Sequence, residues 1–279
     1  MGQPVLSVII PAHNESALIG RLLAGLAVDE RLQLIVVANG CTDATAATAR
    51  AISPRITVVE IPEASKVAAL NAGDAATQVF PRAYVDADVT VTPDTLLALA
   101  AALPDAVARV AAPRFVVDVE GASAAAKRYF AVWAVSPYRT DALVGAGIYA
   151  LSRAGRARFG VFPDIIADDQ FVQELFAREE RLVLPGHSFS VAAPRSVEAL
   201  LGRLARSTLG NEQLRAVVGV GPGASGAGPR ELIARVARRP ALWPAFPTYA
   251  RIYLAARRRA RRALAAGDLA WTRDESTRA

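Results

Sequence analysis

Short apolar runs alternate with helix-like stretches over the first 90 residues. The runs have the length of buried parallel strands, and turn or polar residues bound them. They lie at Val5 to Ile10, Leu32 to Ala38, Ile56 to Ile61 and Ala83 to Val85. Helical segments are predicted between them, each after a capping sequence, at Ala17 to Leu26, Ala44 to Ala51 and Lys66 to Ala76. This order predicts an α/β fold with a parallel sheet and right-handed crossovers.

The pattern in the second half of the chain is less regular. We predict a helix near Gly121 to Val135, a strand at Leu143 to Leu151 and a helix that starts at Asp168. Arg195 to Val218 is predicted to be helical, and Arg230 to Ala265 to form helices broken by prolines. The glycine-rich segment 219–229 is predicted to be a flexible loop.

Polar residues follow the predicted strands where a parallel sheet binds its ligands, beyond the carboxyl ends of the strands. They lie at Pro11 to Glu15, Asn39 to Asp43 and Asp86 to Asp88. The first of these turns contains no glycine, so it is not the dinucleotide fingerprint G-x-G-x-x-G, and no P-loop motif occurs in the chain. The charge of a bound diphosphate would therefore have to be met by a cation.

Two carboxylates at the end of the fourth strand could hold that cation. Asp86 and Asp88 are separated by one residue, and oxygen ligands alone suit Mg²⁺ or Mn²⁺. A lone D-x-D sequence is also common in solvated turns. The location at the exit of a strand favours the metal site over that alternative.

Five segments in order make the chain resemble the inverting glycosyltransferases of family 2. They are SVIIPAHNES at 7–16, VVANGCTDAT at 36–45, SKVAALNAG at 65–73, VDADV at 85–89 and PDIIADDQF at 163–171. The resemblance implies a GT-A fold, a Rossmann-like, mainly parallel mixed sheet flanked by helices, with a helical C-terminal extension. The implied domains are a catalytic domain at 1–195 and a basic extension at 196–279 that contains the flexible loop 219–229. The catalytic domain would divide into a nucleotide-sugar half at 1–110 and an acceptor half at 111–195.

The same resemblance implies roles for individual residues. Those expected to contact the nucleotide sugar are Pro11, His13 and Glu15 at the nucleoside, Asn39 and Asp43 at base and ribose, Lys66 at the nucleotide or phosphate, and Asp86, Ala87 and Gly147 at the donor. Simpler interpretations stand beside some of these roles. Asn39 is typical of a turn and Asp43 of a helix cap, Lys66 could be a solvated helix residue, and Gly147 could serve tight strand packing.

The acid pair at the start of the predicted helix matches the region where the family carries its catalytic base. Alignment on the apolar residues that follow puts Asp169 at the base position and Asp168 at the preceding acid. Without the resemblance, acids in the first turn of a helix are more often a cap. His187 is a further candidate for the metal or a phosphate, although Pro185-Gly186 predicts that it lies in a turn with a structural role.

The expected function is sugar transfer, of the hexosyltransferase type, in the synthesis of cell-envelope polysaccharides, glycolipids or glycoconjugates. The donor would be a UDP, GDP or dTDP sugar, and the acceptor a sugar, a lipid-linked molecule or a small molecule. A sugar-nucleotide-forming nucleotidyltransferase is an alternative, but it would need a glycine-rich phosphate loop after the first strand. A non-catalytic nucleotide-sugar-binding protein is another, and the presence of Asp86, Asp88 and Asp169 argues against it.

Charge is concentrated in the C-terminal part of the chain. Residues 195–279 contain 16 Arg and 6 acidic residues, net +10, whereas the rest contains 16 basic and 20 acidic residues, net −4. Aromatic residues accompany the arginines of Arg251 to Arg262, which suits either the inner face of a membrane or a solvated face. No nucleic-acid-binding module accompanies the charge. A single cysteine and the lack of a long apolar run predict a cytoplasmic protein.

Overall fold

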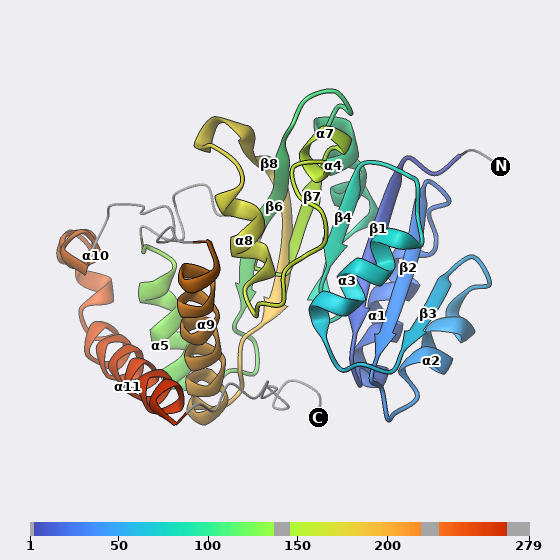
Figure 1. The fold of residues 1–279 in the computed structure, drawn as a ribbon. Coiled ribbons are helices and arrows are strands. Elements are labelled where there is room, and N and C mark those ends of the chain that lie inside the picture. Colours follow the sequence, from blue (N-terminus) through green and yellow to red (C-terminus); the bar gives the residue numbers. More distant parts are fainter. Residues whose placement is uncertain (1–2, 137–145, 219–228, 267–279) are drawn as a thin grey trace. The chain divides into compact units, whose positions relative to one another are not determined.

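A computed structural model describes residues 3–136, 146–218 and 229–266 of the chain (Figure 1). It divides into two compact units that we describe separately. The first unit consists of Met1–Val116, Val144–Asp164 and Phe171–Val191, and the second of Val117–Leu143, Ile165–Gln170 and Ala192–Ala279. None of the helices in the described ranges is long and apolar enough to cross a membrane.

The first unit is built around a mixed sheet with the strand order β3-β2-β1-β4-β7-β6-β8-β5. The strands are β1 (Leu6–Ala12), β2 (Leu32–Asn39), β3 (Thr57–Ile61), β4 (Arg82–Val85), β5 (Val89–Thr90), β6 (Val110–Asp118), β7 (Ile148–Leu151) and β8 (Arg181–Ala192). Strands β1 to β4 are mutually parallel, so their carboxyl ends meet at one edge. Strand β7 pairs antiparallel with β4 and with β6.

The helices that connect the parallel strands follow the predicted order. They are α1 (Ser16–Leu26), α2 (Thr45–Ile52) and α3 (Lys66–Ala75). The helix α4 (Pro93–Ala102), which the sequence did not predict, follows β5, and the short helices α7 (Arg153–Arg156) and η1 (Arg178–Glu180) come later. The first three helices and the four parallel strands confirm the sequence prediction to within two residues at each end. The predicted cap of α3 is also confirmed, because the Ser65 side chain accepts a hydrogen bond from the Ala68 amide at 3.1 Å.

The core beneath the parallel strands forms because α3 turns an apolar face onto them. Val67 and Leu70 of the helix pack with Ile9 of β1 and Val37 of β2. The approach is closest at Gly73, where an added Cβ would lie 2.4 Å from a methyl group of Ile9. Only a residue without a side chain fits there, which fixes the height of α3 above β1.

Two long strands, β6 and β8, were not predicted from the sequence. Both contain a proline, and the pattern at Pro185-Gly186 predicted a turn instead. That prediction is wrong, because His187 lies within β8. Gly186 has a φ of +79°, which glycine adopts without strain, so the strand continues through the proline-glycine pair.

The second unit is helical. Its main helices are α5 (Ala124–Trp133), α9 (Val197–Val218), α10 (Pro229–Ala237) and α11 (Phe246–Ala265), with a 3-10 turn η2 (Pro240–Leu242) between the last two. Tyr129 of α5 packs in one apolar cluster with Leu200 of α9 and Tyr249 of α11. The C-terminal helices therefore share a core with α5, a helix that we had expected in the acceptor half of the catalytic domain. Residues 219–228 of the predicted flexible loop lie outside the described residues.

Candidate functional site

The loops that follow the parallel strands are held together at the carboxyl edge of the sheet. The loop after β2 begins at Gly40, whose amide donates to the carbonyl of Ile61 at the end of β3, at 2.8 Å. Gly40 has a φ of +55°, and an added Cβ would lie 2.7 Å from Ala64. Both its backbone conformation and the lack of space require glycine here, so two neighbouring loops can pack directly.

Asp43 joins the loops after β1 and β2. Its carboxylate accepts from the amide of Ser16, the first residue of α1, at 3.2 Å and from the amide of Thr45, the first residue of α2, at 3.0 Å. Burial raises the pKa of Asp43, but the hydrogen bonds from Thr45 and Ser16 outweigh it and lower the pKa to about 2. The N-cap residues of the two helices are Glu15 and Ala44, and neither makes a side-chain cap hydrogen bond. Asp43 supplies an acceptor to the first amide of both helices instead, so it fills the role of a cap at two helix ends.

The proposed nucleoside contacts lie along the same edge. Asn39 is buried and its side-chain amide donates to the carbonyl of Ala12 at 3.0 Å, which ties the end of β2 to the end of β1. His13 contacts the carbonyl of Asn39 through Nδ1. Because a carbonyl only accepts, Nδ1 carries the proton. Pro11 is buried inside β1, and the amide of the buried Glu15 donates to the Thr45 hydroxyl at 2.7 Å.

Asn14 is a residue of this edge that the sequence interpretation did not single out. It adopts the left-handed conformation, with a φ of +49°, and its side-chain carbonyl accepts from the Thr42 amide at 2.7 Å. Asparagine tolerates this conformation better than most residues. The partner is 28 residues away, so sequence spacing alone gave no signal for the contact.

Asp86 and Asp88 follow β4 at this edge. Both side chains are partly exposed, whereas the intervening Ala87 and the following Val89 are buried. The chain turns at this point, with the Val89 amide 3.4 Å from the Asp86 carbonyl. The Nζ atom of Lys66, the first residue of α3, lies 2.8 Å from Oδ1 of Asp86. The ammonium group of Lys66 thus already faces one of the two carboxylates, that of Asp86.

Gly147, the residue before the neighbouring strand β7, supports this turn. Its carbonyl accepts from the amide of Asp86 at 2.8 Å. Its φ is +121°, and an added Cβ would lie 3.0 Å from Val89 and 3.4 Å from Phe189. The tight packing that the sequence suggested is therefore present, and it holds the backbone of Asp86 directly.

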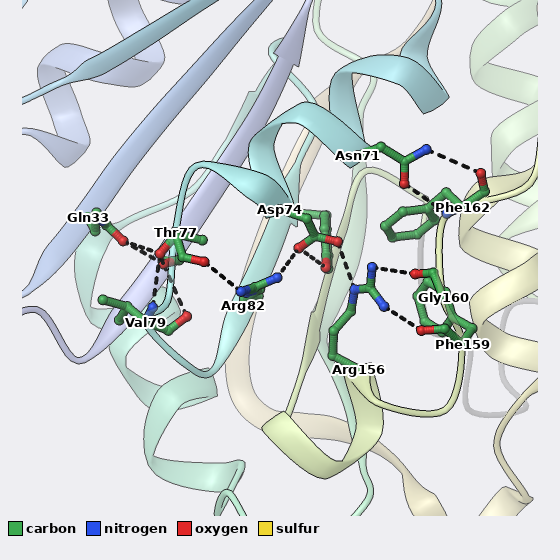
Figure 2. A network of polar contacts seen from close by, with 12 residues as sticks. Gln33, Asn71, Asp74, Thr77, Val79, Arg82, Arg156, Phe159, Gly160 and Phe162 are labelled. Carbon is green, nitrogen blue, oxygen red and sulfur yellow. Dashed lines mark hydrogen bonds and ion pairs between the residues drawn. The ribbon is translucent and has the colours of Figure 1, made fainter.

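A buried polar network holds the other end of α3 to the same strand (Figure 2). Asp74 is 8% exposed and accepts from Arg82 of β4 and from Arg156 of α7, each at 2.7 Å. The hydroxyl of Tyr84 in β4 donates to Asp74 at 2.8 Å. Burial, followed by the nearby Asp74 charge, raises the pKa of Tyr84 well above its usual range. The hydroxyl therefore stays protonated and can donate to Asp74.

The network also fixes the chain segment beyond α7. Arg156 donates to the carbonyls of Phe159 and Gly160, both at 2.7 Å, and its guanidinium lies over the Phe159 ring (Figure 2). Asn71 of α3 accepts from the Phe162 amide at 2.8 Å. Two ion pairs therefore link α3 to β4 and the turn after it. Lys66 pairs with Asp86 at the start of the helix, and Asp74 pairs with Arg82 near its end. The sequence gave no indication of this network, because Arg156 lies 82 residues from Asp74 and the nearer members belong to a different element.

The acid pair lies at the start of α8 (Asp168–Glu174), as predicted. Asp168 is 2% exposed, and Asp169 is half-buried and accepts from the amide of Gln170 at 2.8 Å. Within the second unit the preceding segment is held by α9, where Gln213 accepts from the Ile166 amide at 3.2 Å. Both acids belong to this second unit, whereas Asp86 and Asp88 belong to the first.

The carboxylates of the first unit suit a metal that takes part of its coordination from substrate and water. Among residues 3–136, 146–218 and 229–266, no group of three or more His, Cys, Asp or Glu is arranged to hold a metal. His187 thus forms no three-residue ligand cluster with Asp86 and Asp88. Mg²⁺ and related ions often use only one or two carboxylates and complete their shell with substrate phosphates. The pair Asp86 and Asp88 fits this type of site.

Comparison with protein families identifies the chain. The model for "Glycosyl transferase family 2" matches residues 7–156, which is more than half of the sequence. The chain belongs to glycosyl transferase family 2. The match includes every nucleotide-side candidate from Pro11 to Gly147 and ends at Arg156 of the buried network. Membership in this family makes the protein a glycosyltransferase, in agreement with the resemblance of its motifs.

Solved structures show that this family 2 member has the GT-A fold. A mannosyltransferase from Pyrobaculum calidifontis, in complex with GDP-mannose and Mn²⁺, is similar with a TM-score of 0.60 and 24% identity, over 96% of this chain and 80% of that chain. Glucosyl-3-phosphoglycerate synthase from Mycobacterium tuberculosis, in complex with Mg²⁺ and UDP, has a TM-score of 0.54 and 19% identity, over 76% of this chain and 79% of that chain. TarS from S. aureus, residues 1–349, has a TM-score of 0.52 and 15% identity, over 96% of this chain and 93% of that chain. Among curated proteins, none matches the chain.

Proposed function

We propose that this glycosyltransferase moves a hexose from a nucleotide-diphosphate sugar to an acceptor hydroxyl with the help of Mg²⁺ or Mn²⁺. The observation that carries the proposal is the group at the exit of β4, where the carboxylates of Asp86 and Asp88 follow a parallel strand and Lys66 of α3 pairs with Asp86. Two similar structures contain a nucleotide or nucleotide sugar together with Mn²⁺ or Mg²⁺. UDP, GDP and dTDP sugars are the candidate donors.

Asp86 and Asp88 would hold the metal, with Asp88 as the main ligand. When bound, the metal would stabilise the charge of the departing nucleoside diphosphate. Lys66 already neutralises Asp86 in the structure, at 2.8 Å. A diphosphate would give that ammonium a second acceptor, so Lys66 can serve the donor while the carboxylate serves the metal.

The edge formed by β1 and β2 would bind the nucleoside. Pro11, His13 and Glu15 would line its pocket, Asn39 and Asp43 would meet base and ribose, and Ala87 and Gly147 would border the donor. The hydrogen bonds of Asn39 and Asp43 to the backbone hold both side chains in fixed positions before any ligand arrives. Such preorganisation reduces the entropy lost on binding.

Asp169 would remove the proton from the acceptor hydroxyl, with Asp168 beside it. Asp169 is half-buried in the first turn of α8, and a positioned carboxylate can take the proton of a substrate hydroxyl. Attack from the face opposite the leaving group would invert the anomeric configuration. The acceptor would be a sugar, a lipid-linked molecule or a small molecule, and the products would belong to cell-envelope polysaccharides, glycolipids or glycoconjugates.

The base assignment is tested by exchanging the carboxylate for an amide of the same shape. Asp169→Asn should bind the donor as the wild type does and transfer sugar about 100-fold to 10,000-fold more slowly, because the general base is lost. The measurement is the release of nucleoside diphosphate from a panel of UDP, GDP and dTDP hexoses with Mn²⁺ and simple sugar acceptors. Asp164→Asn, at an exposed acid just before α8, is the matched control and should leave the rate unchanged. Equal rates in Asp169→Asn and the control would disprove the assignment.

A further inference from the structure

The surface formed by α10, η2 and α11 is strongly basic. Residues 229–266 contain ten arginines and one acidic residue, Glu231, which gives a net charge of +9. Glu231 is already paired with Arg235 one turn further along α10. Exposed arginines therefore dominate this part of the second unit, and we call it the basic surface.

The two faces of α11 differ in composition. Tyr249, Ile252, Ala256 and Ala260 recur every three or four residues and are buried in the second unit. The opposite stripe, at the same spacing, consists of Arg251, Leu254, Arg258 and Arg262, all of them exposed. The helix thus already has an apolar face in the core, and Leu254 is an additional apolar residue that projects outward between arginines.

Exposed apolar side chains accompany the arginines elsewhere on the basic surface. Ile233 of α10 is 52% exposed, Leu254 53% and Trp243, between η2 and α11, 57%. The Trp243 Nε1 atom donates to the carbonyl of Val236 at 3.2 Å, so its polar atom is satisfied and the exposed part of the ring is apolar. Single exposed apolar residues are ordinary. Arg259 pairs with Glu198 of α9 and Arg235 with Glu231, but the net charge of residues 229–266 stays strongly positive. Exposed apolar residues within such a basic segment are typical of segments that lie at a lipid interface.

We propose that the basic surface binds membranes that contain anionic lipids. The arginines would meet the lipid phosphates, and Leu254 and Trp243 would enter the boundary between headgroups and acyl chains. A nucleic acid would offer the same phosphate charge but no apolar layer for these two side chains. The proposal concerns where the enzyme binds and does not depend on the donor, the metal or the base proposed above.

The test measures co-sedimentation of the full chain with vesicles of phosphatidylcholine, with or without about 30% phosphatidylglycerol. The wild type should bind only the anionic vesicles, and added salt should weaken the binding. The triple variant Arg251→Gln, Arg258→Gln, Arg262→Gln should bind about 100-fold more weakly. A triple variant with the same loss of charge in the first unit, Arg21→Gln, Arg114→Gln, Arg178→Gln, should bind as the wild type does, because those exposed arginines lie elsewhere.

The single variants Leu254→Ser and Trp243→Ser separate a lipid surface from other polyanions. Each should weaken vesicle binding while leaving the arginines in place, and they decide the question if the triple variant does not fold. The proposal is overturned by equal binding to neutral vesicles, by no binding at all, or by equal losses in the two triple variants. It is also overturned if single-stranded RNA displaces the vesicles and binds both serine variants as well as the wild type.

Discussion

Single side chains at the carboxyl edge of the sheet serve folding and the proposed chemistry together. Asp43 caps α1 and α2, Asn39 ties β2 to β1, and Lys66 neutralises Asp86. The sequence predicted the local part of these contacts, because a cap depends on neighbours two or three residues away. It could not show that Asp43 also reaches Ser16, 27 residues earlier, since that contact exists only once the sheet has formed.

Replacement of Asp43 tests its role in folding. Asp43→Ala should lower the free energy of unfolding by about 1–2 kcal/mol at pH 7, the usual loss for a helix cap, because two helix ends lose an acceptor. Asp43 is exposed, so solvent screening keeps the effect in that range. Urea denaturation of wild type and variant measures the difference.

The pH dependence of that difference follows from the lowered pKa of Asp43. A carboxylate whose pKa falls from 3.8 to about 2 on folding stabilises the fold fully above pH 3.8 and loses this contribution as the pH falls toward 2. The difference between wild type and Asp43→Ala should therefore shrink between pH 4 and pH 2. An unchanged difference at pH 2.5 would contradict the proposed cap.

Elements were predictable where their pattern was local and uninterrupted. The strands β1 to β4 and the helices α1 to α3 follow from apolar runs and capping residues. Strands β6 and β8 were missed because Pro113 and Pro185 break their patterns, and only pairing within the sheet reveals them. The ion pairs of Asp74 near the end of α3 could not be predicted either, because its two arginine partners come from other elements.

The buried network gives a prediction for the stability of the first unit. Asp74→Ala should lower the free energy of unfolding by about 3–5 kcal/mol, because Arg82 and Arg156 would remain buried without their carboxylate. Asp105→Ala removes an exposed pair with Arg153 and should cost less than about 1 kcal/mol. Chemical denaturation compares the two variants, and similar losses in both would show that the network adds little. If Asp74→Ala does not fold, Asp74→Asn should show an intermediate loss.

For the whole molecule, the sequence predicted the α/β class and the family, whereas the two compact units combine segments that are far apart in the chain. The helix α5 shares a core with the C-terminal helices, because its apolar face at Tyr129 matches theirs. The first unit contains the candidate metal ligands, and the second contains Asp168 and Asp169. This division concerns long-range packing, which no local pattern encodes.

We propose that Asp88 holds a divalent cation which the donor needs. The most direct measurement is calorimetric titration of the panel of nucleotide sugars into the enzyme, with Mn²⁺ and with a chelator. We predict that one donor binds only with Mn²⁺, and that Asp88→Ala weakens this binding at least about 100-fold, since even outer-shell partners of a metal cost 10–100-fold. Asp94→Ala, at an exposed acid in the first turn of α4, should bind as the wild type does. Equal donor affinity with Mn²⁺ and with the chelator, or equal affinity of Asp88→Ala and the wild type, would contradict this assignment.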